Sequence, residues 1–200
     1  MINNKFIGIA GNIGVGKTTM TNELASQLNL KPIFESVIDN PYLEDFYDNM
    51  SRWSFNLQIY FLYDRFYRQI ELMKSNVNFI QDRTIYEDKE IFAFNLYKSG
   101  KMSERDWKTY SNLFSTMSEF IKAPDLIVYL KANTDTLISR IENRKREFEK
   151  DISPEYIHSL NIYYDKWINN LNQDKVLVVD TNNFNIFKDK DMLENIINDI

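Results

Sequence analysis

Hydrophobic positions along this 200-residue chain are concentrated in short apolar runs, which are separated by longer segments of mixed character. The runs are continuous instead of alternating, as expected for strands buried on both faces. The segments between them are long enough for helices, so the pattern predicts an α/β fold with a parallel sheet surrounded by helices. The five predicted strands are Lys5–Ala10, Pro32–Ser36, Asn78–Asp82, Leu126–Leu130 and Lys175–Asp180.

Helical patterning is clearest in three of the intervening segments. Lys17–Leu28 follows the first strand directly, the longest helix is predicted at about Met50–Ser75, and Ser103–Ile121 is more apolar than packing on one face of a sheet requires. We expect most aromatic residues of the long helix to lie in the core or an interface and not in a ligand site. These aromatic residues are Trp53, Phe55, Tyr60, Phe61, Tyr63, Phe66 and Tyr67.

Composition restricts the class of protein. With 44% hydrophobic residues and no internal repeat or linker, the chain is expected to form a single domain over residues 1–200. The net charge is −5 and the basic residues are dispersed, which argues against nucleic acid as a partner. There is no cysteine and only one histidine, His158, so a thiolate metal site and a zinc site are both excluded.

Targeting signals are not evident in the sequence. No apolar run approaches the roughly 20 residues that a membrane-spanning helix needs. The N-terminus enters the first strand directly and leaves no room for a signal peptide. We therefore expect a cytoplasmic protein without a membrane partner.

The segment GIAGNIGVGKTT, at Gly8–Thr19, fits the pattern G-x-x-x-x-G-K-[ST]. In this pattern backbone N–H groups cradle phosphates, the lysine reaches the outer phosphates and the hydroxyl after it meets Mg²⁺. The preceding strand and following helix supply the context that the pattern requires. The predicted phosphate-binding residues are Gly11, Asn12, Ile13, Gly14, Val15, Gly16, Lys17, Thr18 and Thr19.

Charged residues follow the other predicted strands at their carboxyl ends, where an open parallel sheet binds its ligands. Glu35 ends the second strand, Asp82 and Arg83 end the third, and a helix carrying Arg140 and Arg144 follows the fourth. Phosphoryl transfer needs cations to neutralise the transferring group and a carboxylate to orient or deprotonate the attacking hydroxyl. Glu35 and Asp82 are the candidate carboxylates, and spacing alone does not decide which binds the hydroxyl and which the metal.

Polar residues on one face of the long helix suggest a polar ligand. Gln58 and Arg65 are seven residues apart, about two helical turns, and therefore project from the same face. A glutamine amide matches the edge of a nucleobase, and Asp88 can hold Arg65 or read the base itself. Taken alone, Gln58 is better explained as an ordinary glutamine on the helix surface.

The segments GNIGVGKTT, FESV, RWSFNLQ, DRTIYED and RIENRKREFE occur together in the order and with the spacing found in deoxyribonucleoside kinases. The chain resembles that family from about Phe6 to Asp180, and the pattern from Trp53 to Gln58 is more specific than the phosphate loop. With an aspartate directly before Arg83, the chain is more similar to the bacterial deoxyadenosine and deoxyguanosine kinases than to the animal enzymes. The resemblance implies a P-loop kinase fold and transfer of phosphate from ATP, with Mg²⁺, to the 5′-hydroxyl of a deoxynucleoside.

The resemblance also implies roles for the residues near the reacting atoms. Glu35 matches the glutamate that contacts the 5′-hydroxyl and is ranked first as the base. Asp82 matches the acid linked to Mg²⁺ together with Thr18, and it remains the alternative proton acceptor. Arg83 matches the arginine near the 5′-oxygen and the transferring phosphate.

Further residues match the nucleoside pocket of the family. Gln58 matches the glutamine that binds the base, Arg65 and Asp88 the pair at the far edge of the base, and Phe92 a stacking wall. Tyr47 matches the tyrosine on the sugar 3′-hydroxyl, with Glu149 as its partner. A tightly packed tyrosine here implies a preference for deoxyribose. The matched residues are Glu35, Tyr47, Gln58, Arg65, Arg83, Asp88, Phe92 and Glu149.

The segment at about 140–152 resembles the lid whose arginines clamp the phosphates of ATP. Arg140, Arg144 and Arg146 are the matched residues, and the first two are one helical turn apart and can face the same ligand. Without the phosphate loop this segment reads as a solvated charged face. Relatives usually carry Arg-Gly-Arg where this chain has Lys145 between its two arginines. The resemblance therefore does not predict the geometry of the hinge of the lid. The segment VDTNNF resembles the loop that packs on the adenine of ATP.

Deoxyadenosine is the preferred acceptor in this interpretation, and deoxyguanosine, deoxycytidine or a broad specificity are alternatives. A nucleoside monophosphate kinase is less favoured and would use Arg65 and Arg83 for the phosphate of the acceptor. A GTPase-type switch is least favoured, because the sequence lacks a guanine-reading N-K-x-D segment. By resemblance, the long aromatic helix and Ser103–Ile121 form a homodimer interface.

Overall fold

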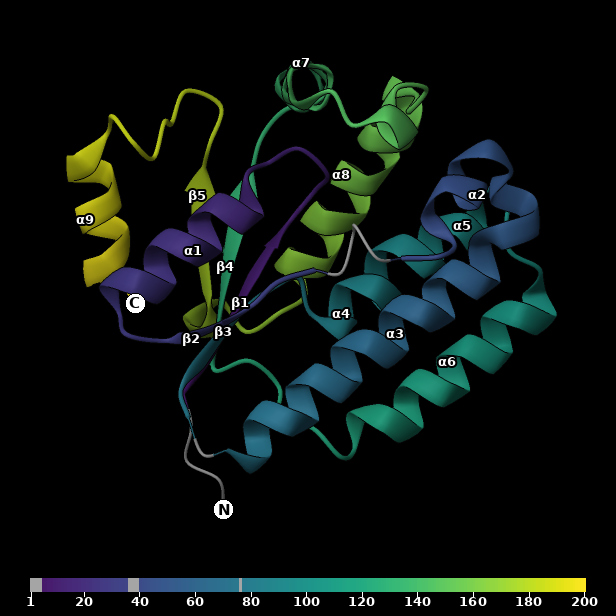
Figure 1. The fold of residues 1–200 in the computed structure, drawn as a ribbon, viewed down its shortest axis with the longest axis horizontal. Helices are drawn as coiled ribbons and strands as arrows, with labels where there is room; N and C mark the ends of the chain where they lie inside the picture. Colours follow the sequence, from purple (N-terminus) through teal and green to yellow (C-terminus); the bar gives the residue numbers. More distant parts are fainter. Residues whose placement is uncertain (1–4, 36–39, 76) are drawn as a thin grey trace.

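A parallel sheet forms the centre of the computed structural model, which describes residues 5–35, 40–75 and 77–200 (Figure 1). Within these residues five strands pair in the order β2-β3-β1-β4-β5, and all pairings are parallel. This confirms the predicted fold class. The strands are β1 (Phe6–Gly11), β2 (Lys31–Ile33), β3 (Phe79–Asp82), β4 (Leu126–Lys131) and β5 (Val176–Asp180).

The strand boundaries differ little from those predicted. The largest difference is in β2, which ends at Ile33, so that Phe34 and Glu35 follow the strand instead of forming its end. Ser36, the last residue of that predicted strand, lies outside the described residues. β1 is buried along its whole length because it lies between β3 and β4 with helices on both faces.

Helical segments cover both faces of the sheet and one of its flanks (Figure 1). On the first face, α1 and α9 pack with β1, β4 and β5, and on the second face α8 packs against β1 and β4. The helical segments are α1 (Lys17–Gln27), α2 (Leu43–Asp48), α3 (Met50–Lys74), α4 (Ile85–Glu87), the π-helical η1 (Asp88–Ala93), α5 (Phe94–Lys98), α6 (Glu104–Ser118), α7 (Thr134–Arg144), η2 (Glu147–Glu149), α8 (Pro154–Asn169), η3 (Gln173–Lys175) and α9 (Lys190–Asn198).

The long helix α3 lies beside α6 on the flank of the molecule (Figure 1). α3 begins at the residue predicted and ends one residue earlier, at Lys74. Two side chains attach α3 to the ends of the α6 region: Ser54 donates to the carbonyl of Lys101 and Gln69 to that of Lys122. α2 and α3 thus form a separate apolar cluster with α4, α5 and α6, away from the sheet. Among the described residues, no helix combines the length and apolar character needed to cross a membrane.

Candidate active site

The phosphate loop connects β1 to the first turn of α1 at the carboxyl edge of the sheet. Gly11 needs to be glycine, because its φ is +149° and a Cβ there would lie 2.7 Å from the carbonyl oxygen of Leu130. Gly16, with φ +103°, stands immediately before α1. Lys17 is 7% exposed, and its ammonium group donates to the carbonyl of Asn12 at 2.9 Å. The Asn12 amide in turn donates to the Ile157 carbonyl at 2.9 Å. This hydrogen bond attaches the loop to α8.

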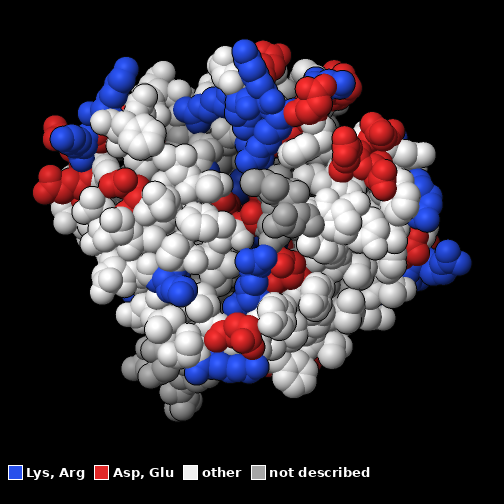
Figure 2. Space-filling model, viewed as in Figure 1, with Lys and Arg blue, Asp and Glu red and all other residues white. Residues whose placement is uncertain are grey.

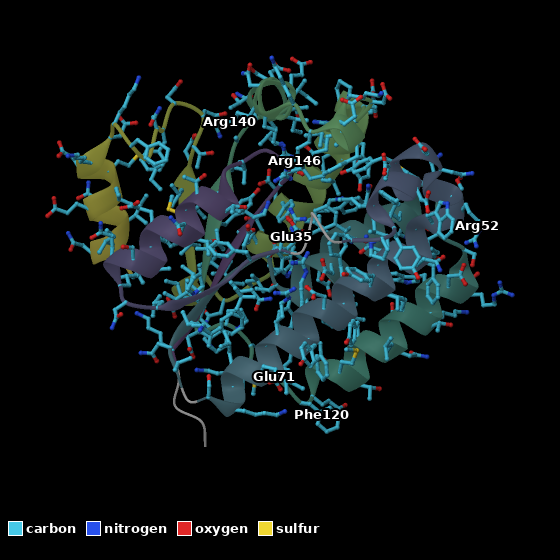
Figure 3. All side chains as sticks on the ribbon, in the orientation of Figure 1. Glu35, Arg52, Glu71, Phe120, Arg140 and Arg146 are labelled. Atoms are coloured by element: carbon cyan, nitrogen blue, oxygen red, sulfur yellow. The ribbon has the colours of Figure 1, made fainter. Side chains whose placement is uncertain are left out.

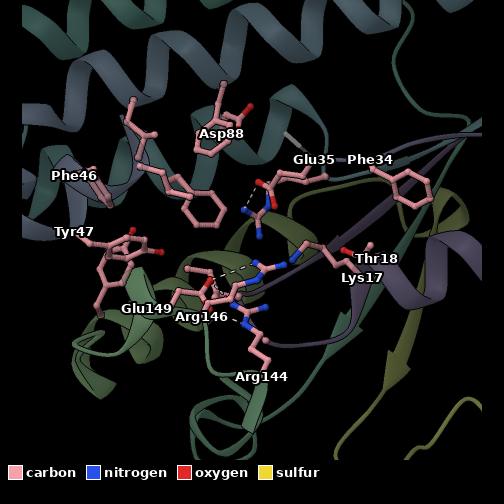
Figure 4. A pocket seen from close by; sticks show the side chains of 18 of the residues that line it. Lys17, Thr18, Phe34, Glu35, Phe46, Tyr47, Asp88, Arg144, Arg146 and Glu149 are labelled. Carbon is pink, nitrogen blue, oxygen red and sulfur yellow. Dashed lines mark hydrogen bonds and ion pairs between the residues drawn. The ribbon is translucent and has the colours of Figure 1, made fainter. Parts of the chain in front are cut away.

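A cavity of about 510 Å³ opens beside this loop (Figure 4). It collects residues from the loop, the segment after β2, α2, α3, η1, the lid segment and α8. Figure 2 shows basic side chains gathered over α7 and the segment after it, next to a hollow in this face. The lining residues are Ile13, Gly14, Gly16, Lys17, Thr18, Thr19, Phe34, Glu35, Leu43, Phe46, Tyr47, Leu57, Gln58, Phe61, Arg83, Asp88, Phe92, Arg144, Arg146, Glu149 and Tyr156.

Glu35, near the middle of the view in Figure 3, lines the cavity and is held by two arginines. Its Oε1 accepts from Arg65 Nη2 at 2.7 Å and from Arg83 Nη1 at 3.0 Å. Burial raises the pKa of Glu35, but Arg83, Arg65 and Lys17 outweigh this effect and lower the pKa to about 2. Glu35 is therefore a carboxylate at neutral pH and is ready to accept a hydrogen bond from a substrate hydroxyl.

At Lys17 the surroundings disfavour the charged form, whereas at Glu35 they favour it. Burial, followed by repulsion from Arg83, lowers the pKa of Lys17 to about 8, although Asp82 and Glu35 favour the charged form. An anionic phosphate beside the ammonium group would restore a higher pKa, because an opposite charge favours the protonated form. An anion bound at the loop would thus stabilise the positive charge of Lys17.

Asp82 is buried and does not line the cavity. Its Oδ2 accepts from Thr18 Oγ1 at 2.6 Å, and its Oδ1 is buried without a hydrogen-bond partner in the described part of the chain. Burial raises the pKa of Asp82 in spite of the nearby Lys17. No cluster of three or more metal-ligating His, Cys, Asp or Glu side chains occurs among the described residues. A hydroxyl beside a carboxylate with one free oxygen nevertheless fits Mg²⁺, which keeps most of its waters and binds substrate phosphates.

Arg65 is buried behind the cavity and is fully engaged. Its Nε donates to Asp88 Oδ2 at 2.6 Å, its Nη2 donates to Glu35, and its Nη1 lies 3.4 Å from the Arg83 carbonyl. Arg65 is absent from the lining of the cavity, whereas Asp88 and Gln58 line it. The structure therefore brings Arg65 together with Asp88 and Glu35, and places it beside these two cavity residues and outside the lining itself.

Arg83 adopts a left-handed backbone conformation, with φ +64°. Such a conformation is costly for a residue with a Cβ and is typical of functional sites. It directs the guanidinium group between Glu35 and the face of Phe92, whose ring centre is 4.2 Å away. Phe92 thus lines the cavity and also packs against Arg83.

The lid arginines Arg144 and Arg146 point toward the cavity and converge on Glu149 (Figure 4). Arg144 makes two hydrogen bonds to the Glu149 carboxylate, at 2.6 and 2.5 Å, and Arg146 lies 3.5 Å from it. Tyr47 lines the same part of the cavity, and burial, together with the neighbouring Tyr156 and Glu149, raises its pKa well above the ordinary value. The structure therefore brings Tyr47 and Glu149 together with the lid.

Arg140 faces a second, smaller cavity of about 260 Å³ on the other side of the phosphate loop. Its guanidinium group donates to the carbonyl of Val15 at 3.3 Å and to both oxygens of Thr181. This cavity is also lined by Phe184, from the loop after β5. Arg140 and Arg144 line different cavities, although they lie one turn apart on α7, because Arg140 is held by Thr181 after β5 and Arg144 by Glu149.

Several residues of the cavity were not singled out from sequence. Most are apolar wall residues whose partners come from distant parts of the chain, so no local pattern distinguishes them from core residues. Tyr156 had no signal at all, and Phe61 was assigned to the aromatic core of its helix. A further omission is Glu87, a fully buried acid close to Arg83. The unpredicted wall residues are Phe34, Leu43, Phe46, Leu57, Phe61 and Tyr156.

A phosphate loop after the central strand of a parallel sheet, facing an acidic and basic cavity, defines the protein as a P-loop kinase. The chain belongs to the deoxynucleoside kinase family, whose sequence profile matches residues 7–200. It is therefore a kinase of deoxynucleosides that uses a nucleoside triphosphate as donor.

Similar proteins include kinases with different named substrates. The deoxyadenosine/deoxycytidine kinase of Bacillus subtilis is 41% identical over 98% of this chain and 92% of its own length. The deoxyadenosine kinase of Dictyostelium discoideum is 42% identical over 84% of this chain and 68% of its own length. The structure of M. mycoides deoxyadenosine kinase with dCMP and dCDP has a TM-score of 0.84 at 31% identity, and covers 98% of this chain and 100% of its own.

Proposed function

We propose that this deoxynucleoside kinase transfers a phosphate from ATP to the 5′-hydroxyl of deoxyadenosine. The observation that carries the proposal is the position of Glu35 in one cavity with Lys17 of the phosphate loop and with Gln58 and Asp88. A carboxylate is thus available between a site for phosphate and a site for a base. The kinases of B. subtilis and D. discoideum described above, which are named for deoxyadenosine, support the choice of acceptor.

The polar groups beside the base site support a base that carries an amino group. Gln58 Oε1 is buried without a partner in the described part of the chain, and Asp88 offers a carboxylate. The donors of Arg65 are already occupied by Asp88 and Glu35. Adenine presents an amino group beside a ring acceptor, which a glutamine amide pairs with two hydrogen bonds. Guanine would place a carbonyl oxygen against these acceptors, and buried polar groups left unpaired reduce turnover strongly.

Deoxycytidine is the second candidate, because cytosine also carries an amino group next to a ring acceptor. The B. subtilis kinase named for both deoxyadenosine and deoxycytidine supports it. Deoxyguanosine is less favoured by the acceptor-rich edge, although a deoxyguanosine kinase of B. subtilis is 35% identical over 84% of this chain and 80% of its own length. The paired state of Arg65, which is held by both Glu35 and Asp88, argues against a monophosphate acceptor.

The proposed roles divide the site into three parts. At the reacting atoms, Glu35 binds the 5′-hydroxyl and Arg83 the transferring phosphate, while Thr18 and Asp82 hold the Mg²⁺. At the sugar, Tyr47 binds the 3′-hydroxyl with Glu149 as its partner. A bound Mg²⁺ would supply charge neutralisation on the donor phosphates.

The donor site is proposed to extend over the phosphate loop into the second cavity. Arg144 and Arg146 of the lid are proposed to clamp the phosphates of ATP. Arg140 and the loop after β5, which includes Phe184, line the smaller cavity and would receive the adenine of ATP. We further infer a homodimer through α3 and α6, and a single-domain, cytoplasmic enzyme remains the prediction from sequence.

The test is a phosphate-transfer assay with Mg-ATP and each acceptor supplied alone: deoxyadenosine, deoxycytidine, deoxyguanosine, thymidine, adenosine and dAMP. We expect the highest kcat/KM with deoxyadenosine, lower turnover with deoxycytidine and little with adenosine. A preference for deoxyguanosine would contradict the proposed reading of Gln58 and Asp88. Turnover of dAMP alone would contradict the proposed acceptor class.

A further inference from the structure

Glu87 is a fully buried acid that does not line the active-site cavity. It lies between the end of β1, the first turn of α4, and α8. Its Oε1 accepts from the backbone N–H of Gly11 at 3.2 Å, and its Oε2 accepts from the N–H of Thr84 at 2.9 Å. Tyr164, which is also fully buried, brings its hydroxyl to within 2.9 Å of Glu87 Oε1. The carboxyl group therefore connects the first residue of the phosphate loop with α8.

The hydroxyl of Tyr164 faces two oxygens but has only one hydrogen. It lies 2.8 Å from the carbonyl oxygen of Gly11 and 2.9 Å from Glu87 Oε1. A carbonyl oxygen only accepts, so the contact between Tyr164 and Gly11 is a hydrogen bond only if Tyr164 gives its hydrogen to Gly11. If Glu87 were ionised, its close contact with Tyr164 would then contain no hydrogen. A proton on Glu87 Oε1 completes the chain, with Glu87 donating to Tyr164 and Tyr164 donating to Gly11.

We propose that Glu87 is held as a neutral carboxylic acid and acts, through Tyr164, as a positioning residue for the phosphate loop and Arg83. This inference rests on the roles proposed above for that loop and for Arg83. The geometry explains why an acid is used here: it accepts from two backbone N–H groups and still donates to a tyrosine.

The charged surroundings of Glu87 agree with a neutral acid. Burial raises the pKa of Glu87, and the opposing influence of Arg83 and Lys17 does not cancel this effect. Arg83 Nε is 3.8 Å from Glu87 Oε1, beyond hydrogen-bonding distance. The hydroxyls of Tyr164 and Tyr129 are further titratable groups near Glu87.

A neutral Glu87 has a direct consequence for Arg83. An ionised Glu87 would compete with Glu35 for the guanidinium group, whereas a neutral one leaves Arg83 paired with Glu35 at 3.0 Å. Arg83 Nη2 also donates to the Gly11 carbonyl at 3.3 Å, the same oxygen that Tyr164 holds. The carbonyl of Gly11 thus fixes the position of Arg83 relative to the phosphate loop. This position matters because small displacements of reacting groups lower the rate of catalysis strongly.

Four variants test the positioning role in the full-length enzyme. Glu87→Ala removes the hydrogen-bonded chain and should lower kcat by about 10- to 100-fold, the typical cost of misplaced reacting groups. Glu87→Gln keeps a donor for Tyr164 and an acceptor for Thr84 but loses the acceptor for the Gly11 N–H, and should stay within about fivefold of wild type, the value of one hydrogen bond. Tyr164→Phe should resemble Glu87→Ala in direction. Glu90→Gln, at a half-buried acid on the neighbouring turn that pairs with Lys89, is the control and should be unchanged.

Infrared difference spectroscopy tests the proton itself. Wild type minus Glu87→Gln should show the carbonyl band of a protonated carboxylic acid at neutral pH, and Tyr164→Phe should shift this band because the acceptor of the proton is removed. Absence of the band, or a Glu87→Gln variant that loses as much kcat as Glu87→Ala, would overturn the inference. The band and its shift do not depend on which acceptor is phosphorylated, so failure of the proposed function would be seen separately, in the wild-type acceptor assay.

Discussion

At the scale of single residues, the active site is organised by charge pairs that a substrate must rearrange. Glu35 is held by Arg65 and Arg83, and its pKa of about 2 makes it a weak base while both pairs are intact. If Arg83 turns to a transferring phosphate, Glu35 loses one of its cations and becomes more basic. A loose phosphoryl transfer needs little proton abstraction early in the reaction, so positioning of the hydroxyl is the main contribution expected of Glu35.

Replacing Glu35 by glutamine tests this role. We expect Glu35→Gln to lower kcat by about two orders of magnitude or more, within the range for loss of a general base, with nucleoside binding nearly intact. Steady-state kinetics together with direct measurement of nucleoside Kd separates the two effects. Glu23→Gln, at a half-buried acid of α1 that accepts a hydrogen bond from Gln27, is a suitable control. Near-normal turnover of Glu35→Gln would remove Glu35 from the base role.

The depressed pKa of Glu35 also predicts a pH dependence of stability. A carboxyl group whose pKa falls from 4.5 to about 2 on folding stabilises the fold above the unfolded pKa, and this contribution is lost as pH falls through that interval. The shift corresponds to about 3 kcal/mol. The stability difference between wild type and Glu35→Gln, from denaturant titrations, should therefore shrink by roughly this amount between pH 6 and pH 2. A stability difference that stays constant with pH would show that the arginine partners do not lower the pKa of Glu35.

At the scale of elements, local sequence patterns located the strands and helices well but missed what their packing creates. The phosphate loop could be read directly, because strand, glycines, lysine and helix are contiguous in the chain. The cavity walls could not be read, because Phe61 and Tyr156 face the cavity only through the placement of α3 and α8. Glu87 was overlooked for the same reason: its partner Tyr164 is 77 residues away in sequence.

The departure at Lys145 has a structural counterpart. Lys145 ends α7 in a left-handed conformation with φ +52°, the conformation that glycine adopts more easily. We expect Lys145→Gly to stabilise the protein by up to about 1 kcal/mol, since relief of strain exceeds the greater freedom of glycine in the unfolded chain. Lys150→Gly, where φ is −59°, should instead destabilise it. Thermal unfolding of the two variants measures both effects, and equal destabilisation would contradict the expected strain at Lys145.

At the scale of the whole molecule, the flank formed by α3 and α6 carries exposed apolar side chains. Tyr63 and Tyr67 of α3 are 58% and 54% exposed, and Leu113 of α6 and Phe120 just after it are 40% and 65% exposed. Exposed apolar groups gathered on neighbouring elements are typical of protein interfaces. The sequence indicated this surface only as an excess of apolar residues, because solvent exposure depends on the finished fold.

The proposed dimer is tested with a charge at this flank. Leu113→Lys should convert a dimer into a monomer, because a lysine in the centre of an apolar interface would be buried without a partner. Phe187→Lys, at a 74% exposed phenylalanine outside α3 and α6, should leave the oligomeric state unchanged. Sedimentation velocity reports the mass of each variant. A wild-type monomer, or a Leu113→Lys dimer, would contradict the proposed interface.

The pairing of Glu149 with Arg144 makes one carboxylate common to both halves of the reaction. In the proposed roles, Arg144 serves the donor and Glu149 serves the sugar of the acceptor. A donor that draws Arg144 away releases Glu149 for the sugar, and a sugar that engages Glu149 releases Arg144 for the donor. Thermodynamic linkage then requires each substrate to increase the affinity for the other by the same factor. The enzyme would thus bind its two substrates cooperatively within a single chain, with the strength of this ion pair setting the size of the effect.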